Sequence, residues 1–221
     1  MNAPLYLVRS ICTRIMTGAD TGAKFKNLLA RIRKNFKHLD LEIKTKKLKD
    51  LELNEFYINA FYDLDADKHN ECSIEVIVYH NIDTDVFFEH SQVGQFIVQL
   101  YDAVVHELRH QEQARRRKYH PNPYIVDVDS NASYLSDPDE VDAYALSIAI
   151  ELIRNLGRSR SIQYLHRASR LANIRPKGLY ASPTLFVYFK DVGNTDHPVV
   201  RKLIKKVFLN LETLDKNAIF Y

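Results

Sequence analysis

The sequence predicts an α+β fold, in which a small, mostly antiparallel sheet packs on one long helix and further helices follow. Three observations predict it: an amphipathic helical pattern near the N-terminus, a series of alternating strand-like segments, and helical patterns over most of the remainder. With 221 residues, 46% of them hydrophobic, the chain can form one well-packed core. We therefore expect a single domain over 1–221, with its core at about 73–155, an N-terminal helix and strands at 1–72, and a helical part at 156–221.

The first helix is expected in TGADTGAKFKNLLARIRKNF, with its end near Lys37, because apolar residues recur there three, four and seven positions apart. Three segments rich in aromatic and β-branched residues then alternate in polarity and predict strands. The cluster DADKHNE between the second and third segments is typical of a turn, so these two strands should form a hairpin. The segments are LEIKTKKL, NEFYINAFYDLD and SIEVIVYHN.

A long helix is expected from about Gln92 to Lys118, and another from Asp137 to about Asn155. Two further helices are expected in SRSIQYLHRASRLAN and HPVVRKLIKKVFLNLETL. The stretch YHPNPYIVDVDSNASYLSD has two prolines and several Asn, Asp and Ser residues, so it predicts a loop.

The composition limits the cellular compartment and the binding partners that we expect for this protein. No apolar run approaches the roughly 20 residues that span a bilayer, and the N-terminus does not resemble a signal peptide, so we expect a cytoplasmic protein with no membrane partner. Cys12 and Cys72 offer neither a disulfide framework nor a C-x-x-C metal pair. Lys24–Lys49 holds ten Lys or Arg against two acids, but solvated faces commonly produce such blocks and stackable aromatics are few there. We therefore do not expect nucleic acid as a partner.

The stretch VVHELRHQEQARRR, from Val104 to Arg117, carries the pattern H-E-x-x-H on the predicted long helix. Positions four apart lie on one face of a helix, so His106 and His110 can aim two imidazoles at one point, as zinc ligands do. Glu107 lies about 100° round the helix, a position that suits a general base better than a ligand. The spacing indicates a catalytic zinc site, and the alternative is an exposed polar stripe on an ordinary helix.

A catalytic zinc usually has three protein ligands. The extended metzincin motif is absent, because Gln113 and Arg116 stand where it requires Gly and its last His. We favour Glu140 as the third ligand, at the start of the next predicted helix. Glu140 could instead serve only as a capping acid, because Asp137 and the residues after it form a good helix start. The alternative ligands are His120, Asp139 and Asp142.

These residues resemble the gluzincin branch of the zincin-like metallopeptidases, especially the compact minigluzincin type. In that family the H-E-x-x-H helix is followed by a second helix, whose Glu is the third zinc ligand, often within E-x-x-A-D. The resemblance covers about residues 73–155 and implies a Zn²⁺ cofactor. Its ligands would be His106, His110 and Glu140, and Glu107 would be the catalytic base.

One residue departs from the family pattern. Tyr144 stands where relatives have an aspartate that hydrogen-bonds a ligand histidine. Asp142, a backbone carbonyl or the Tyr144 hydroxyl itself could supply that acceptor. In the family, the strand before the motif helix is the sheet edge along which an extended peptide lies, and SIEVIVYHN holds that place by order.

The resemblance implies hydrolysis of a peptide bond in a protein or peptide substrate, with Glu107 moving the proton. A second donor should stabilise the oxyanion. Three functional classes stay open: a zinc-dependent endopeptidase, a zincin-fold binding or regulatory protein, and a nucleic-acid-associated protein that uses its basic segments. Proteins of this type are frequent in bacteria and phages, which favours such a source. The candidates for this donor are Tyr134, Tyr144, His166 and Arg109. We expect Tyr144, together with Glu107, to be catalytic.

Overall fold

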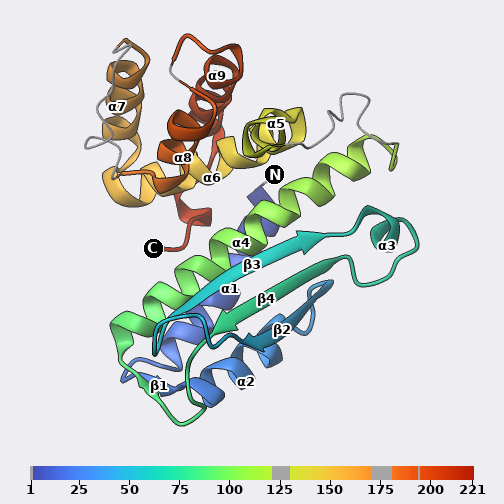
Figure 1. Ribbon diagram of the computed structural model, residues 1–221, viewed down its shortest axis with the longest axis vertical. Helices are drawn as coiled ribbons and strands as arrows, with labels where there is room; N and C mark the ends of the chain where they lie inside the picture. The colour runs from blue at the N-terminus through green and yellow to red at the C-terminus, as the bar shows by residue number, and fades with distance from the viewer. Residues whose placement is uncertain (1, 121–129, 171–180, 194) are drawn as a thin grey trace. The chain divides into compact units, whose positions relative to one another are not determined.

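The computed structural model describes residues 2–120, 130–170, 181–193 and 195–221 (Figure 1). The chain divides into two compact units: unit 1 is Met1–Tyr119 with Phe220–Tyr221, and unit 2 is His120–Ile219. Helices with two small sheets make up these units, which confirms the α+β class. The expectation of a single domain stays a prediction, and each unit is described by itself.

Unit 1 consists of one long helix, a mixed sheet and smaller helices. The helix expected to end near Lys37, the three strands and the long helix are all present. The turn cluster DADKHNE contributes to a short helix between two strands, and an N-terminal helix precedes the expected first one. The elements are α1 (Asn2–Thr17), β1 (Ala23–Lys24), α2 (Phe25–Phe36), β2 (Leu41–Lys47), β3 (Phe56–Tyr62), α3 (Leu64–Lys68), β4 (Ile74–His80), β5 (Phe87–Phe88) and α4 (His90–Arg116).

The three-stranded sheet has the order β2-β4-β3. Strand β4 pairs with β3 in antiparallel register, as the hairpin prediction requires, and with β2 in parallel register. The expectation that SIEVIVYHN forms the sheet edge is therefore wrong, because this segment is the central strand and β3 is an edge. The burial of Ile74, Val76 and Val78, each at most 1% exposed, fits a central strand that is covered by neighbours on both sides.

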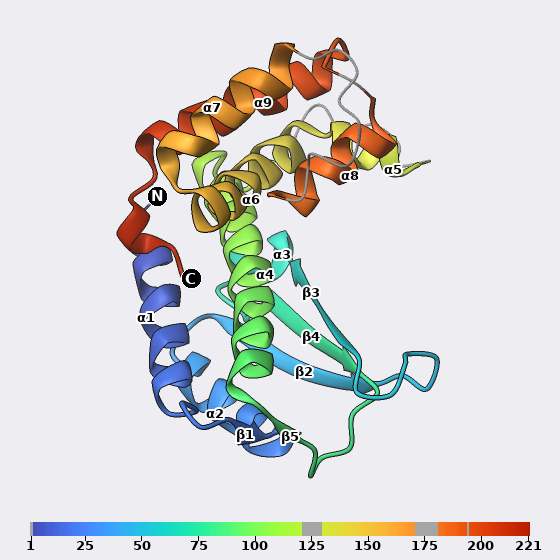
Figure 2. The same cartoon turned by 90° about the vertical axis from the view of Figure 1, so that its left-hand side faces the viewer.

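Helix α4 packs with β3 and β4 on one side and with α1 on the other, as Figure 2 shows. Four apolar residues of α4 are fully buried: Phe96, Ile97, Leu100 and Val104. Phe25, Phe56, Phe88 and Phe96 form an aromatic cluster at its N-terminal end. The helix is therefore anchored along its length before it reaches the H-E-x-x-H motif.

Unit 2 is helical in its described residues. Helix α6 is central and packs with α9, α7, α8 and α5. The expected helices near 137–155, 159–173 and 197–214 are found, with bounds shifted by a few residues. The predicted loop is wrong over 131–136, which is helical, and 121–129 lies outside the described residues. The elements are α5 (Asn131–Ser136), α6 (Pro138–Leu156), α7 (Arg158–Arg170), α8 (Pro183–Asp191), α9 (Pro198–Thr213) and the 3-10 helix Lys216–Ala218.

None of the helices in the described ranges combines the length and the apolar character that crossing a bilayer requires.

Candidate metal centre

The two motif histidines of unit 1 lie together on α4. The Nε2 atoms of His106 and His110 are 3.2 Å apart, and their ring centroids are 4.9 Å apart. Two nitrogens bound at about 2.0–2.1 Å to one tetrahedral zinc ion lie about 3.3 Å from each other. The pair therefore has the separation that two ligands of a single ion require. Both rings are only partly buried, so a ligand can reach them.

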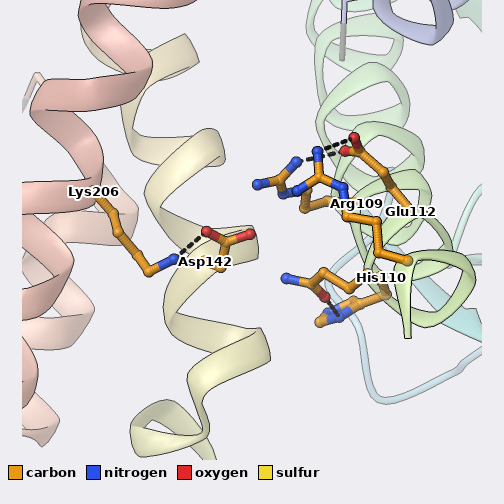
Figure 3. A network of polar contacts seen from close by, with 7 residues as sticks. Arg109, His110, Glu112, Asp142 and Lys206 are labelled. Carbon is orange, nitrogen blue, oxygen red and sulfur yellow. Dashed lines mark hydrogen bonds and ion pairs between the residues drawn. The ribbon is translucent and has the colours of Figure 1, made fainter. Parts of the chain in front are cut away.

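Gln113 fixes the ring of His110. Its side-chain Oε1 lies 3.0 Å from Nδ1 of His110, one helical turn away on the same face (Figure 3). When Nδ1–H donates to this oxygen, Nε2 carries the lone pair, as a metal ligand must. The residue that replaces the metzincin glycine thus acts as the hydrogen-bond acceptor of a candidate ligand, a role that the sequence reasoning missed.

Glu107 follows His106 directly and is buried, with 8% of its surface exposed. The preceding residues Val104 and Val105 are buried as well. The role of general base that the spacing assigns to Glu107 stays a prediction.

Arg109, a candidate oxyanion donor, is engaged within its own helix. Its guanidinium pairs with Glu112 three residues along, and Glu112 also binds Arg116 at 2.6 Å (Figure 3). Arg109 is 7% exposed, so it is held in place by this pair. The arrangement favours a structural role for Arg109 on α4.

A buried carboxylate anchors the end of α4 beyond the histidines. Asp67, on α3, accepts hydrogen bonds from Nε and Nη2 of Arg115 at 3.1 and 2.7 Å and from Gln111 at 3.3 Å. The Tyr62 hydroxyl donates to the same carboxylate at 2.9 Å. These bonds raise the pKa of Arg115, with the Asp67 hydrogen bond as the largest cause. Gln111 and Arg115 lie at the two ends of the helical turn that follows His110, so this network fixes the rotation of α4 about its own axis.

In unit 2, Glu140 lies in the first turn of α6. The Asp137 side chain caps this helix by accepting from the Asp139 N–H at 2.7 Å, and Pro138 follows the cap. The predicted helix start is therefore confirmed, with Glu140 in the third helical position. An acid at this place interacts favourably with the helix dipole, whatever else it binds.

Three tyrosines from three helices gather near Glu140. The ring of Tyr144 lies between Tyr134 on α5 and Tyr188 on α8, with centroid distances of 6.4 and 5.7 Å. Burial raises the pKa of Tyr134, and the charge of Glu140 and hydrogen bonds to Glu140 and Tyr144 raise it further. The hydroxyl of Tyr134 therefore stays protonated and can donate at neutral pH.

Tyr188 was not anticipated from the sequence. It is fully buried, and its hydroxyl meets no hydrogen-bond partner in the described part of the chain. Burial raises its pKa, followed by the charges of Tyr144 and Glu140. Helix α8 is fixed to α6 by Glu151, which accepts from the side chains of Ser182 and Thr184 at 2.5 and 2.6 Å. Only this long-range docking brings Tyr188 to the tyrosine cluster.

Three further candidates for a ligand or an oxyanion donor lie in unit 2. Asp142 forms an ion pair with Lys206 of α9 (Figure 3). His166, on α7, is exposed and packs on the ring of Phe208 at 4.8 Å. His120 is exposed at the end of a described segment. These positions favour structural or surface roles for Asp142 and His166.

No family model, curated protein or solved structure matches this chain significantly. The functional conclusion therefore rests on the residues themselves.

Proposed function

We propose that the protein is a zinc-dependent metallopeptidase with a zincin-like arrangement, in which His106, His110 and Glu140 bind the metal. The observation that carries the proposal is the 3.2 Å separation of the two Nε2 atoms, with Gln113 accepting from His110 on its far side. Two imidazoles and a carboxylate are a donor set that catalytic zinc sites use. Glu140 is assigned as the third ligand because the resemblance to gluzincins implies a glutamate at this place.

The chain's own residues would carry the proton. When bound, zinc would supply Lewis acidity that activates a water and polarises a peptide carbonyl. The Glu107 carboxylate would accept the proton of the attacking water and release it to the nitrogen of the leaving amine. Tyr134, protonated at neutral pH beside Glu140, and Tyr144 are the hydroxyl donors that we assign to this site.

The substrate in this proposal is an extended peptide that adds to strand β3. This strand pairs with β4 alone among the described strands, so its other edge has backbone groups available for a further strand. It also packs directly against α4. The large exposed side chains on its outer face, Tyr57 and Phe61, would contact alternate side chains of the peptide.

Metal content tests the proposal. Purified protein should hold about one zinc ion per chain, and His106→Ala and His110→Ala should lose it, because each removes one ligand. His166→Ala, at an exposed histidine of α7, is the matched control and should keep the zinc. Glu140→Gln distinguishes a zinc ligand from a helix-capping residue. The amide keeps most of the capping role but lacks the charge that binds zinc, so this variant should lose zinc if Glu140 is a ligand. Full zinc retention in both histidine variants would refute the proposed function.

A further inference from the structure

Unit 2 carries a strongly cationic surface on α7 and α9. Within the bounds of these two helices the sequence has eight Lys or Arg residues and one acid, Glu212. This imbalance lies outside the candidate metal centre and outside the basic N-terminal block, and neither of them explains it.

The two helices form one continuous surface. They pack together along their length (Figure 2). At one end the Arg158 guanidinium donates to the backbone carbonyls of Glu212 and Leu214, and further along His166 packs on Phe208. The start of α7 therefore lies beside the end of α9, so the helices run in opposite directions and their outward faces adjoin.

Five cations on these helices are exposed and form no ion pair within the described residues: Arg160, Arg167, Arg201, Lys202 and Lys205. The N-terminal basic block differs, because several of its lysines are neutralised by acids. Lys24 and Lys26 bind Asp85, Lys44 binds Glu42 and Glu75, and Lys47 binds Asp83. The number of charged residues in the sequence does not show this difference in ion pairing, whereas the structure does.

Two of these cations lie where a positive charge does not stabilise the helix. Neither α7 nor α9 has an acid in its first turn, and Arg160 and Arg201 lie close to the helix starts. A positive charge there opposes the helix dipole. Exposed cations without ion pairs in the described residues, on two adjoining helices and in two cases opposed to the helix dipole, indicate an anionic partner.

We propose that the α7–α9 surface binds nucleic acid through its phosphate backbone. Rows of exposed Lys and Arg along adjoining helices match the regular charge of a phosphodiester chain, and the His166–Phe208 pair provides aromatic surface among them. A membrane surface fits less well, because the apolar residues of α9 face inward and Leu209 is its one large exposed hydrophobic residue. This inference does not depend on the metal centre.

Fluorescence anisotropy with labelled DNA of about 25 nucleotides, single-stranded and duplex, tests the proposal. The test variant combines Arg167→Gln, Arg201→Gln, Lys202→Gln and Lys205→Gln. The control removes the same charge from exposed N-terminal positions that form no ion pair within the described ranges: Lys34→Gln, Lys37→Gln, Lys46→Gln and Lys49→Gln. At about 50 mM salt the test variant should lose at least about tenfold in affinity and the control less than about twofold. The slope of log affinity against log salt should fall by about 0.7–0.9 for each phosphate contact removed.

Several outcomes would overturn the proposal. They are absence of DNA binding by the unaltered protein at about 50 mM salt, equal losses in the two variants, and unchanged affinity in a test variant whose thermal melting is normal. Stronger binding to vesicles of anionic phospholipid than to DNA, lost in the test variant, would assign the surface to a membrane instead. If the test variant does not fold, the pair Lys202→Gln and Lys205→Gln, expected to lose at least about threefold, replaces it under the same criteria.

Discussion

At the scale of single residues, two tyrosine hydroxyls differ in what they contact, that of half-buried Tyr62 and that of buried Tyr188. The Tyr62 hydroxyl donates to Asp67 at 2.9 Å, whereas the Tyr188 hydroxyl has no hydrogen-bond partner among the described residues. A buried polar group without a partner keeps its full desolvation cost, and a satisfied one recovers it. Tyr188 therefore lowers the stability of the unit that contains it, and a residue of that kind is characteristic of functional sites.

We predict that Tyr188→Phe leaves the free energy of unfolding unchanged or raises it by about 1 kcal/mol, because the ring stays and the unsatisfied hydroxyl goes. Tyr62→Phe is the matched control and should lower that free energy by about 1 kcal/mol. Urea denaturation of both variants in chelator-treated buffer measures the difference. If Tyr188→Phe is as destabilising as Tyr62→Phe, the Tyr188 hydroxyl has a hydrogen-bond partner in the fold and this account of it is wrong.

The residues of the candidate site show how much of its geometry can be predicted from the sequence. The spacing of His106, Glu107 and His110 along one helix predicts how these side chains lie relative to one another, and their functional roles stay predictions. Gln113 could have been found in the same way, since residues three apart on a helix are neighbours. Tyr188 could not, because its place beside Tyr144 depends on the docking of α8 through Glu151, and no local pattern encodes a contact of that range.

At the scale of secondary-structure elements, strand β4 ends in a buried histidine. His80 is 8% exposed, its ring lies 4.9 Å from that of Phe25 at the start of α2, and its Nδ1 accepts from the Ile82 N–H at 3.3 Å. Burial lowers the pKa of His80 below its ordinary value of 6.5. The neutral imidazole is therefore part of the packing between the sheet and α2.

The consequence is a pH-dependent stability of this packing. Because the pKa of His80 is lower in the folded state, the unfolded chain binds more protons once the pH falls to about 6.5. The contribution of His80 to stability is thus complete above pH 6.5 and is lost as the pH falls toward the folded pKa. We predict that His80→Asn, which keeps an acceptor, shows a smaller loss of unfolding free energy between about pH 7 and pH 5 than the unaltered protein.

His38→Asn, at an exposed position, is the control for this measurement. Chemical denaturation at several pH values gives the curves to compare. A loss of stability with pH that is the same in His80→Asn and in the unaltered protein would show that His80 is not its source.

Element prediction succeeded where local patterns dominate and failed where tertiary contacts decide. Helix α8 has the sequence PTLFVYFKD, whose aromatic and β-branched residues do not favour a helix, and it forms because Ser182 caps it and Glu151 binds that cap. The expected edge position of SIEVIVYHN was wrong for a related reason. The alternation in β4 predicts a strand, but its central place depends on the long-range pairing with β2.

At the scale of the whole molecule, the sequence predicted the α+β class because periodicities of two and of 3.6 residues alternate along the chain. Which cations form ion pairs could not be predicted from the sequence, because a count of charges does not show which lysines contact acids. The two proposals belong to different parts of the chain, and each can fail without the other.

The central claim is that Glu107 moves a proton during cleavage of a peptide bond, and its most direct test is turnover. Unaltered protein and Glu107→Gln, each loaded with zinc, are incubated with proteins of a cell lysate, and new peptide termini are identified by mass spectrometry. Loss of a general base lowers the rate by about 10² to 10⁴, while the amide keeps the side-chain volume and leaves the metal ligands in place. The account predicts termini that only the unaltered protein produces and that chelation abolishes. Termini that appear equally with Glu107→Gln, or a zinc-loaded protein that produces none, would contradict it.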